Sequence, residues 1–257
     1  MAWMHVQISS DEIRMPTSIE VLLPQAAVEK LAQGEKLPVL YLLHDKTGDH
    51  SEWLKKAALE TYQEEVPIAI VMPSGNASYF VNLKYGKSYQ NYIRDELPAI
   101  CERLFPVSDK KEEKFLAGVG MGGYGALNIA LTPDCPFGMI GAFDADIDMR
   151  KHYEENPEKM EEIFGSFAEY EKSSNCLCHA AECLTEAEFG NGKLPRIIMM
   201  CNKEASIIEE NKQLYSMIKK KSDDIELRAC AEVSGWRYYG ECLYAFMKSI
   251  KEELCLL

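Results

Sequence analysis

Basic residues are scarce in this chain of 257 residues, which has 28 Lys and Arg against 41 Asp and Glu and a formal net charge of −13. A protein that binds the phosphate backbone of nucleic acids needs a positively charged face, so no nucleic-acid partner is expected. No apolar run approaches the roughly 20 residues that span a bilayer. We therefore expect no association with a membrane.

Export and disulfide signals are also missing. The N-terminal "MAWMHVQISSDEIRM" has no basic region followed by an apolar core, so a signal peptide is not expected. Nine cysteines, an odd number, are scattered without the spacing of a disulfide framework. This pattern predicts reduced thiols and a cytoplasmic location. Homo-oligomerisation is left open by the sequence.

Short apolar segments alternate with helical patterns along the chain. Strands are expected at 18–24, 37–44, 66–73, 114–119, 138–145, 195–202 and 225–233, and helices at 51–62, 88–104, 122–131, 206–221 and 240–254. Alternation of this kind predicts an α/β fold, with a mostly parallel central sheet of about eight strands and helices on both faces. We expect one domain over 1–257, with 149–193 as a polar, mostly helical insertion near the site.

The glycine-rich stretch "FLAGVGMGGYGALNIAL" at 115–131 follows a predicted strand and opens a predicted helix. Gly118 and Gly122 are spaced so that the strand and the helix can approach closely, as in a nucleophile elbow. The same stretch satisfies G-x-G-x-x-G, a weak signal for dinucleotide binding. That alternative is disfavoured because three strands precede the motif and no suitable acidic residue ends a following strand. No cofactor is expected.

Four ordered motifs extend the pattern along most of the chain: "LPVLYLLHDKTGDHSEW", "VMPSGNASYFVNLKYGKSYQNYIRDELPAICERLFP", "AGVGMGGYGAL" and "SGWRYYGECLYAFM". With them the sequence resembles the esterase D-like α/β-hydrolases, which include tributyrin, acetyl and feruloyl esterases and S-formylglutathione hydrolases. The resemblance implies an α/β-hydrolase fold with a catalytic Ser, Asp and His. It also implies an oxyanion loop that stabilises the negative oxygen of the acyl intermediate.

The sequence departs from that family at each catalytic position. By the resemblance, the serine falls on Gly120, the aspartate on Ala205 and the histidine on Ser234. Independently, no histidine follows His179, so no base can come from the loop after the final strand. Nucleophile, base and orienting acid act as a unit in acyl transfer. The sequence therefore predicts an esterase-family member that has lost hydrolysis. Glycine at 120 would also relieve the strain of a positive φ.

The oxyanion loop changes as well, because the family's "HG" is His44-Asp45 here. The resemblance places the oxyanion loop at Asp45, Lys46 and Met121. A carboxylate at Asp45 would oppose the oxyanion unless its side chain points away. The surrounding residues favour a pocket for a small molecule such as an ester, a carboxylic acid or a carbohydrate-like ligand. Its predicted lining residues are His44, Tyr79, Asp144 and Trp236, with His44 also favoured as a brace for the loop.

Other residue clusters give weaker signals. Asp144, Asp146 and Asp148 follow a strand and could bind a cation or a sugar hydroxyl, although a solvated turn with a helix cap is favoured. Soft metal ligands occur in "NCLCHAAEC", namely Cys176, Cys178, His179 and Cys183. Their spacing lacks the usual pairs of a zinc site, so no metal site is predicted.

Two other functions stay open. An active carboxylesterase could use a rebuilt site, with Ser234 or Ser206 and a distant histidine. An interaction or scaffold protein would use the acidic insertion instead of a pocket.

Overall fold

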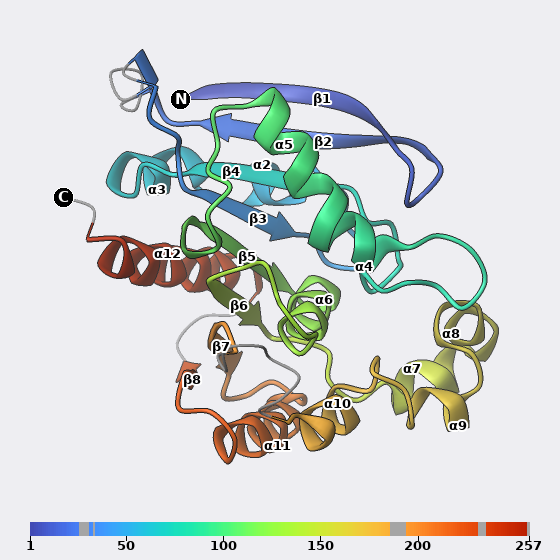
Figure 1. Cartoon of the computed structure of the whole chain (residues 1–257). Helices are drawn as coiled ribbons and strands as arrows, with labels where there is room; N and C mark the ends of the chain where they lie inside the picture. Colours follow the sequence, from blue (N-terminus) through green and yellow to red (C-terminus); the bar gives the residue numbers. More distant parts are fainter. Residues whose placement is uncertain (26–30, 33, 186–193, 231–234, 256–257) are drawn as a thin grey trace.

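A single eight-stranded sheet organises the computed structural model, which describes residues 1–25, 31, 32, 34–185, 194–230 and 235–255. The strands are β1 (Ala2–Ser10), β2 (Met15–Leu23), β3 (Val39–Leu43), β4 (Ala69–Pro73), β5 (Lys114–Val119), β6 (Met139–Phe143), β7 (Arg196–Asn202) and β8 (Ile225–Cys230). They lie in the order β1-β2-β4-β3-β5-β6-β7-β8, from top to bottom in Figure 1. The pairs β1-β2 and β2-β4 are antiparallel and the other pairs are parallel, which confirms the predicted mostly parallel sheet.

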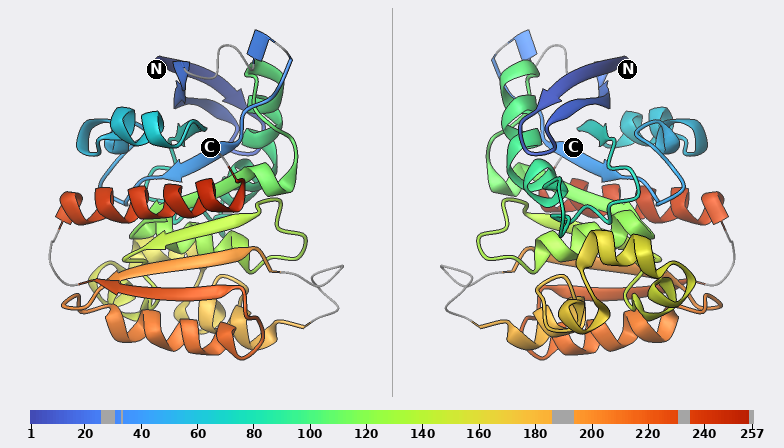
Figure 2. Two further views of the ribbon diagram at one scale, coloured as in Figure 1. Left: turned by 90° about the vertical axis from the view of Figure 1, so that its left-hand side faces the viewer. Right: turned by 90° about the vertical axis from the view of Figure 1, so that its right-hand side faces the viewer.

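Helices cover both faces of the sheet (Figure 2). They are α2 (Glu52–Lys56), α3 (Leu59–Glu65), α4 (Tyr89–Asn91), a π-helical turn (Tyr92–Glu96), α5 (Leu97–Leu104), a 3₁₀ turn (Lys111–Glu113), α6 (Met121–Ala130), α7 (Arg150–Glu155), α8 (Pro157–Phe164), α9 (Phe167–Tyr170), α10 (Leu177–Cys183), α11 (Ile208–Lys219) and α12 (Gly235–Glu253). One buried cluster joins the sheet to α5, α6, α11 and the insertion, and a second joins it to α2, α3 and α12. None of the described helices is long and apolar enough to cross a bilayer.

Most predicted elements are present, with three differences. The sequence pattern missed β1, whose alternate residues Met4, Val6 and Ile8 face the core. The predicted helix at 51–62 is two short helices, separated by the extended Ala57. Helix α12 begins at Gly235, five residues before the predicted start.

The predicted helical insertion contains α7 to α10 in its described part, and residues 186–193 lie outside that part. Three of its helices, α7, α8 and α9, lie beyond the carboxyl end of β3, on the right of Figure 1. This is the edge of a parallel sheet at which ligand sites form. The three helices therefore lie at this edge of the sheet.

Candidate functional site

The turn between β5 and α6 has the backbone of a nucleophile elbow. Gly120 lies between the two elements with φ of +54°, a region that side chains rarely adopt. A Cβ at Gly118 would lie 2.4 Å from the carbonyl carbon of Gly122, and a Cβ at Gly122 would lie 2.7 Å from the oxygen of Leu43. The glycines therefore allow the close approach of strand and helix that their spacing predicts.

The Asp45 carboxylate fills the space beside Gly120. A Cβ built on Gly120 would lie only 2.3 Å from Asp45 Oδ1, so no side chain fits there without movement of Asp45. The Met121 N–H donates a hydrogen bond to the same oxygen at 3.1 Å, and the Lys46 N–H donates to the carboxylate as well. Of the three residues that the resemblance assigns to the oxyanion loop, Lys46 and Met121 thus direct their backbone N–H groups at the side chain of the third, Asp45. The Asp45 side chain therefore points toward these two N–H groups and does not point away.

Burial sets the electrostatics of this carboxylate. It raises the pKa of the Asp45 carboxyl above its ordinary value, while the hydrogen bonds from Met121 and Lys46 oppose the shift. The nearby acids Asp146 and Glu52 raise the pKa further. Glu52 is itself buried, accepts a hydrogen bond from the Asp45 N–H at 3.0 Å and pairs with the ammonium of Lys56 at 2.9 Å. Asp45 is thus a largely buried carboxylate that accepts hydrogen bonds from the backbone N–H groups of Met121 and Lys46.

His44 braces the start of this loop. Its Nδ1 lies 2.7 Å from the Asp45 carbonyl oxygen, and its Nε2 accepts a hydrogen bond from the Gly75 N–H at 2.9 Å. This pair of contacts selects the neutral tautomer with the proton on Nδ1. Burial lowers the pKa of His44, which also favours the neutral ring. Both ring nitrogens are engaged, so neither is available to a ligand.

A histidine that sequence reasoning did not select lies at the same edge. His152 is on α7 of the insertion, and its Nε2 lies 3.5 Å from Asp146 Oδ2. The Lys46 ammonium lies 3.4 Å from His152 Nδ1, and the ring of Tyr79 packs against the imidazole at 5.8 Å between centroids. The sequence signal was an Asp after a strand followed six residues later by a His. Only the placement of the insertion brings this pair to the elbow.

The two aromatic residues predicted to line the pocket lie apart. Tyr79 is buried in the cluster with α5 and α6, has a positive φ of 54° and packs against Tyr124 and Phe164. Burial, followed by the charges of acids that include Asp146 and Asp45, raises the pKa of its hydroxyl. Trp236 packs edge-on against Trp53 on the other face of the sheet. They do not form one wall, and Tyr79 alone lies with Asp45 and His152.

The remaining catalytic-position equivalents supply no catalytic groups. Ala205 lies in the turn after β7, where its N–H donates to the Asn202 carbonyl at 3.0 Å. Ser234 lies outside the described residues.

Asp144 is half-buried and accepts a hydrogen bond from the Asn202 N–H at 2.8 Å, and burial raises its pKa. It joins the ends of β6 and β7 and is not a solvated turn residue. Asp148 accepts a hydrogen bond from the Arg150 N–H at 2.8 Å, but it is not the predicted helix cap, because the N-cap of α7 is Met149.

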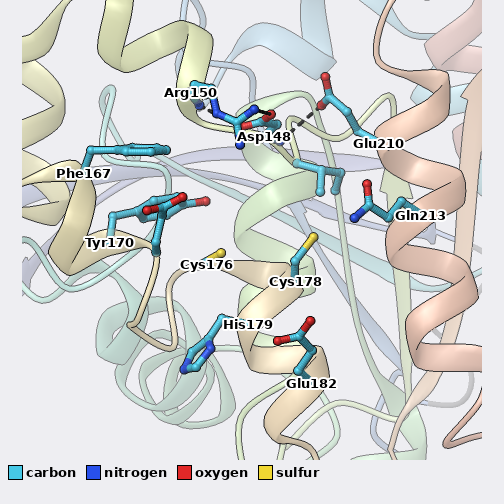
Figure 3. Close-up of a pocket in the computed structure, with 12 residues that line it drawn as sticks. Asp148, Arg150, Phe167, Tyr170, Cys176, Cys178, His179, Glu182, Glu210 and Gln213 are labelled. Atoms are coloured by element: carbon cyan, nitrogen blue, oxygen red, sulfur yellow. Dashed lines mark hydrogen bonds and ion pairs between the residues drawn. The ribbon is translucent and has the colours of Figure 1, made fainter.

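The cysteine-rich segment lines a different cavity, of about 340 Å³, between the insertion and α11. Figure 3 shows Cys176, Cys178 and His179 on its lower side and Glu210 and Gln213 on α11. Cys183 Sγ lies 3.6 Å from His179 Nε2, but the four predicted soft ligands do not converge with their ligand atoms within 4.8 Å of one another. Neither Gly120 nor Asp45 lines this cavity.

Comparisons with known proteins support the same fold. A curated acetyl esterase of Caldicellulosiruptor saccharolyticus is 26% identical over 237 residues, which cover 88% of this chain and 89% of the relative. Fluorophosphonate-binding serine hydrolase F of Staphylococcus aureus superimposes with a TM-score of 0.86 at 23% identity, covering 97% of this chain and 98% of its own. The S-formylglutathione hydrolase of the same organism gives 0.84 at 22% identity over the same shares.

The family model with the description "Putative esterase" matches residues 10–182, more than half of the chain. The matched range contains β2 to β6, the elbow at Gly120 and the loop with Asp45. The sheet order, the elbow and these similarities are those of the α/β-hydrolase fold. The chain therefore belongs to this esterase family.

Proposed function

We propose that this member of the esterase family does not hydrolyse esters and that its own Asp45 occupies the anion site. One observation carries the proposal: Asp45 Oδ1 lies 2.3 Å from the position of a Cβ on Gly120 and 3.1 Å from the Met121 nitrogen. An oxyanion hole works by donating preorganised N–H groups to the developing charge. Donors that already hold a carboxylate are not free for a substrate oxygen.

The residues at the three catalytic positions support the same proposal. Gly120 has no atom that can attack a carbonyl, and Ala205 has no oxygen that can orient a base. Ser234 has no proton acceptor comparable to an imidazole. Loss of the nucleophile alone costs roughly 10⁶ in turnover in a serine hydrolase. The Asp45 carboxylate hinders hydrolysis independently of these three substitutions, because it occupies the N–H groups that would stabilise the oxyanion.

The function that we assign to the edge beside Asp45 is the binding of a small molecule, in the class of carboxylic acids, esters or carbohydrate-like compounds. Lys46 is exposed, and its ammonium lies next to His152. The ammonium offers a positive charge and a hydrogen-bond donor to an acidic group of the ligand. Tyr79 adds a ring beside them. Thermal unfolding in the presence of acetate, ferulate and simple sugars tests this, because a ligand stabilises the folded state as its concentration exceeds Kd.

Hydrolysis is tested with p-nitrophenyl acetate and with a fluorophosphonate label. We expect turnover at the rate of the buffer and no labelled protein. Turnover that a serine-directed phosphonate abolishes would overturn the proposal. The curated acetyl esterase relative provides the positive control under the same conditions.

A second candidate, an active carboxylesterase with a rebuilt site, is favoured by the contact between His152 and Asp146 at 3.5 Å. An imidazole oriented by a carboxylate is two thirds of a triad. This candidate predicts activity that is lost in His152→Ala and kept in His179→Ala. Inactivity of the native protein excludes it.

A cytoplasmic location and a single domain over 1–257 remain our proposals. The buried cysteines Cys101, Cys135 and Cys201 support the first, because they are free thiols. Continuity of the eight-stranded sheet from β1 to β8 supports the second.

A further inference from the structure

Three side chains with metal-binding atoms meet at the other end of the loop that begins with His44. His5 on β1 lies directly opposite Glu20 on β2, and His50 precedes α2. His5 Nδ1 lies 2.8 Å and His50 Nε2 lies 3.7 Å from Glu20 Oε1. Among the described residues, this is the one group of three His, Cys, Asp or Glu side chains whose ligand atoms all lie within 4.8 Å of one another.

We propose that His5, Glu20 and His50 bind a divalent transition-metal ion of the Zn²⁺ class. Two imidazoles and one carboxylate form a ligand set that holds zinc with one position left open. Zinc ligands about 2.0–2.1 Å from the ion in a tetrahedron lie roughly 3.3 Å from one another. The separations of 2.8 and 3.7 Å bracket this value, so the ion fits with small side-chain movements.

The environment of Glu20 supports an ion at this place. Its side chain is only 5% exposed, so an ionised carboxylate here needs a strong partner. The indole N–H of Trp3 donates to the far oxygen, Oε2, at 2.6 Å. That bond orients the carboxylate and leaves Oε1 directed at the two histidines. Carboxylates that bind metals are held in this way by a hydrogen bond to their second oxygen.

Solvent reaches the group through the histidines. The side chain of His5 is 53% exposed and that of His50 is 21% exposed, which gives an ion a route of entry and leaves room for a water ligand. The two rings lie 5.3 Å apart at 44°, so they are tilted and not stacked. An ion would connect His50, on the same loop as Asp45, to the β1-β2 pair at the edge of the sheet.

Without an ion, Glu20 would keep the hydrogen bond from Trp3 and its contacts with the His5 and His50 rings. Metal binding and a proton shared between His5 and Glu20 exclude each other, because the lone pair of each ligating nitrogen must face the ion. The two arrangements therefore differ in a measurable way, by spectroscopy and by affinity.

Cobalt(II) titration of the full-length, untagged protein, after dialysis against a chelator, tests the proposal. We expect one equivalent to bind with visible d–d bands of a low-symmetry nitrogen and oxygen site. His5→Gln and His50→Gln should each weaken binding on the order of 100-fold, and Trp3→Phe by about tenfold. His179→Gln is the matched control and should bind as the native protein does.

Trp3 is an exposed residue, so Trp3→Phe keeps the test independent of any folding defect in the histidine variants. Far-ultraviolet circular dichroism of each variant checks its fold. Absence of d–d bands, or equal affinity in native protein and His5→Gln, would overturn the proposal. So would a near-ultraviolet thiolate-to-cobalt band at one equivalent, because it would assign the ion to cysteines.

Discussion

The loop from His44 to Ser51 contains one carboxylate, Asp45, and approaches another, Glu20, and the two lie in contrasting surroundings. At its start, Asp45 receives hydrogen bonds from the backbone N–H groups of Met121 and Lys46. At its end, His50 approaches Glu20, whose other partners are the His5 ring and the Trp3 indole. One carboxylate is surrounded by fixed donors, and the other by two imidazoles that change between donor and acceptor.

This difference in partners determines what each place can bind. A backbone N–H can only donate, so the site at Asp45 suits an anion and is filled by the chain's own carboxylate. An imidazole can offer a lone pair, so the site at Glu20 suits a cation. Two carboxylates near one loop therefore lead to opposite expectations, a closed anion site and an open cation site.

The largest expected effect comes from emptying the anion site in a chain with restored catalytic groups. The triple variant Gly120→Ser, Ala205→Asp, Ser234→His supplies a nucleophile, an acid and a base, but the Asp45 carboxylate still competes for the space beside the new side chain and for the N–H of Met121. Adding Asp45→Gly should raise the rate with p-nitrophenyl acetate by at least about 100-fold, the effect of one oxyanion-hole donor. Burst kinetics and labelling with a fluorophosphonate measure it.

Asp45→Gly alone is the control for this experiment, because Gly120 then leaves the chain without a nucleophile. It should stay inactive. Equal activity in the triple and quadruple variants would contradict our view that Asp45 blocks the site.

A smaller effect is expected on stability from Gly120→Ser. The φ of +54° strains any side chain, and the new Cβ would meet Asp45 Oδ1 at 2.3 Å. We expect a loss of about 1–3 kcal/mol in the free energy of unfolding. In an Asp45→Gly background the loss should shrink by about 1 kcal/mol, because the two positions are in contact. Urea unfolding of the four proteins in this cycle gives both values.

Gly34→Ser provides the matched control for strain without contact. Its φ is +80°, and a Cβ there meets nothing within 4 Å. It should be destabilising to the same degree with Asp45 or Gly at position 45. If Gly120→Ser lowers the free energy of unfolding equally with Asp or Gly at position 45, then Asp45 does not fill the space beside Gly120.

The elbow could be predicted from sequence because its geometry depends on local spacing. Gly118 and Gly122 must lack side chains because here the strand turns directly into the helix. Between them, Gly120 tolerates the positive φ. The apolar runs similarly predicted the seven strands β2 to β8. Six of these have parallel neighbours, and parallel strands buried on both faces leave a continuous apolar pattern. Strand β1 was missed although Met4, Val6 and Ile8 alternate toward the core.

The contacts that distinguish this site depend on tertiary structure. The rotamer of Asp45 depends on its neighbours in the folded chain, the start of α6 at Met121 and the carboxylate of Glu52. The presence of an aspartate at position 45 therefore could not predict the direction of its side chain. His152 reaches Asp146 only because of how the insertion packs against the sheet edge. His5 and Glu20 are paired by the register of two strands, and a one-residue slip would separate them.

The smallest effect, and the sharpest test of the charge at the anion site, is expected from Asp45→Asn. The amide keeps an acceptor for Met121 but carries no charge. Burial raises the pKa of Asp45 in the folded protein above its value in the unfolded chain. The favourable contribution of Asp45 to the free energy of unfolding is therefore complete below the unfolded-state pKa and is lost as pH rises through the folded-state pKa. Asp45→Asn should therefore be more stable than the native protein near pH 7, and the difference should shrink as the pH falls to about 4. Urea midpoints across that range measure the difference, with Glu204→Gln, at an exposed carboxylate of the turn after β7, as the control that should show no such trend. If the difference in stability between Asp45→Asn and the native protein is the same at every pH, the effect comes from packing, and the charge of the Asp45 carboxylate does not destabilise the folded protein.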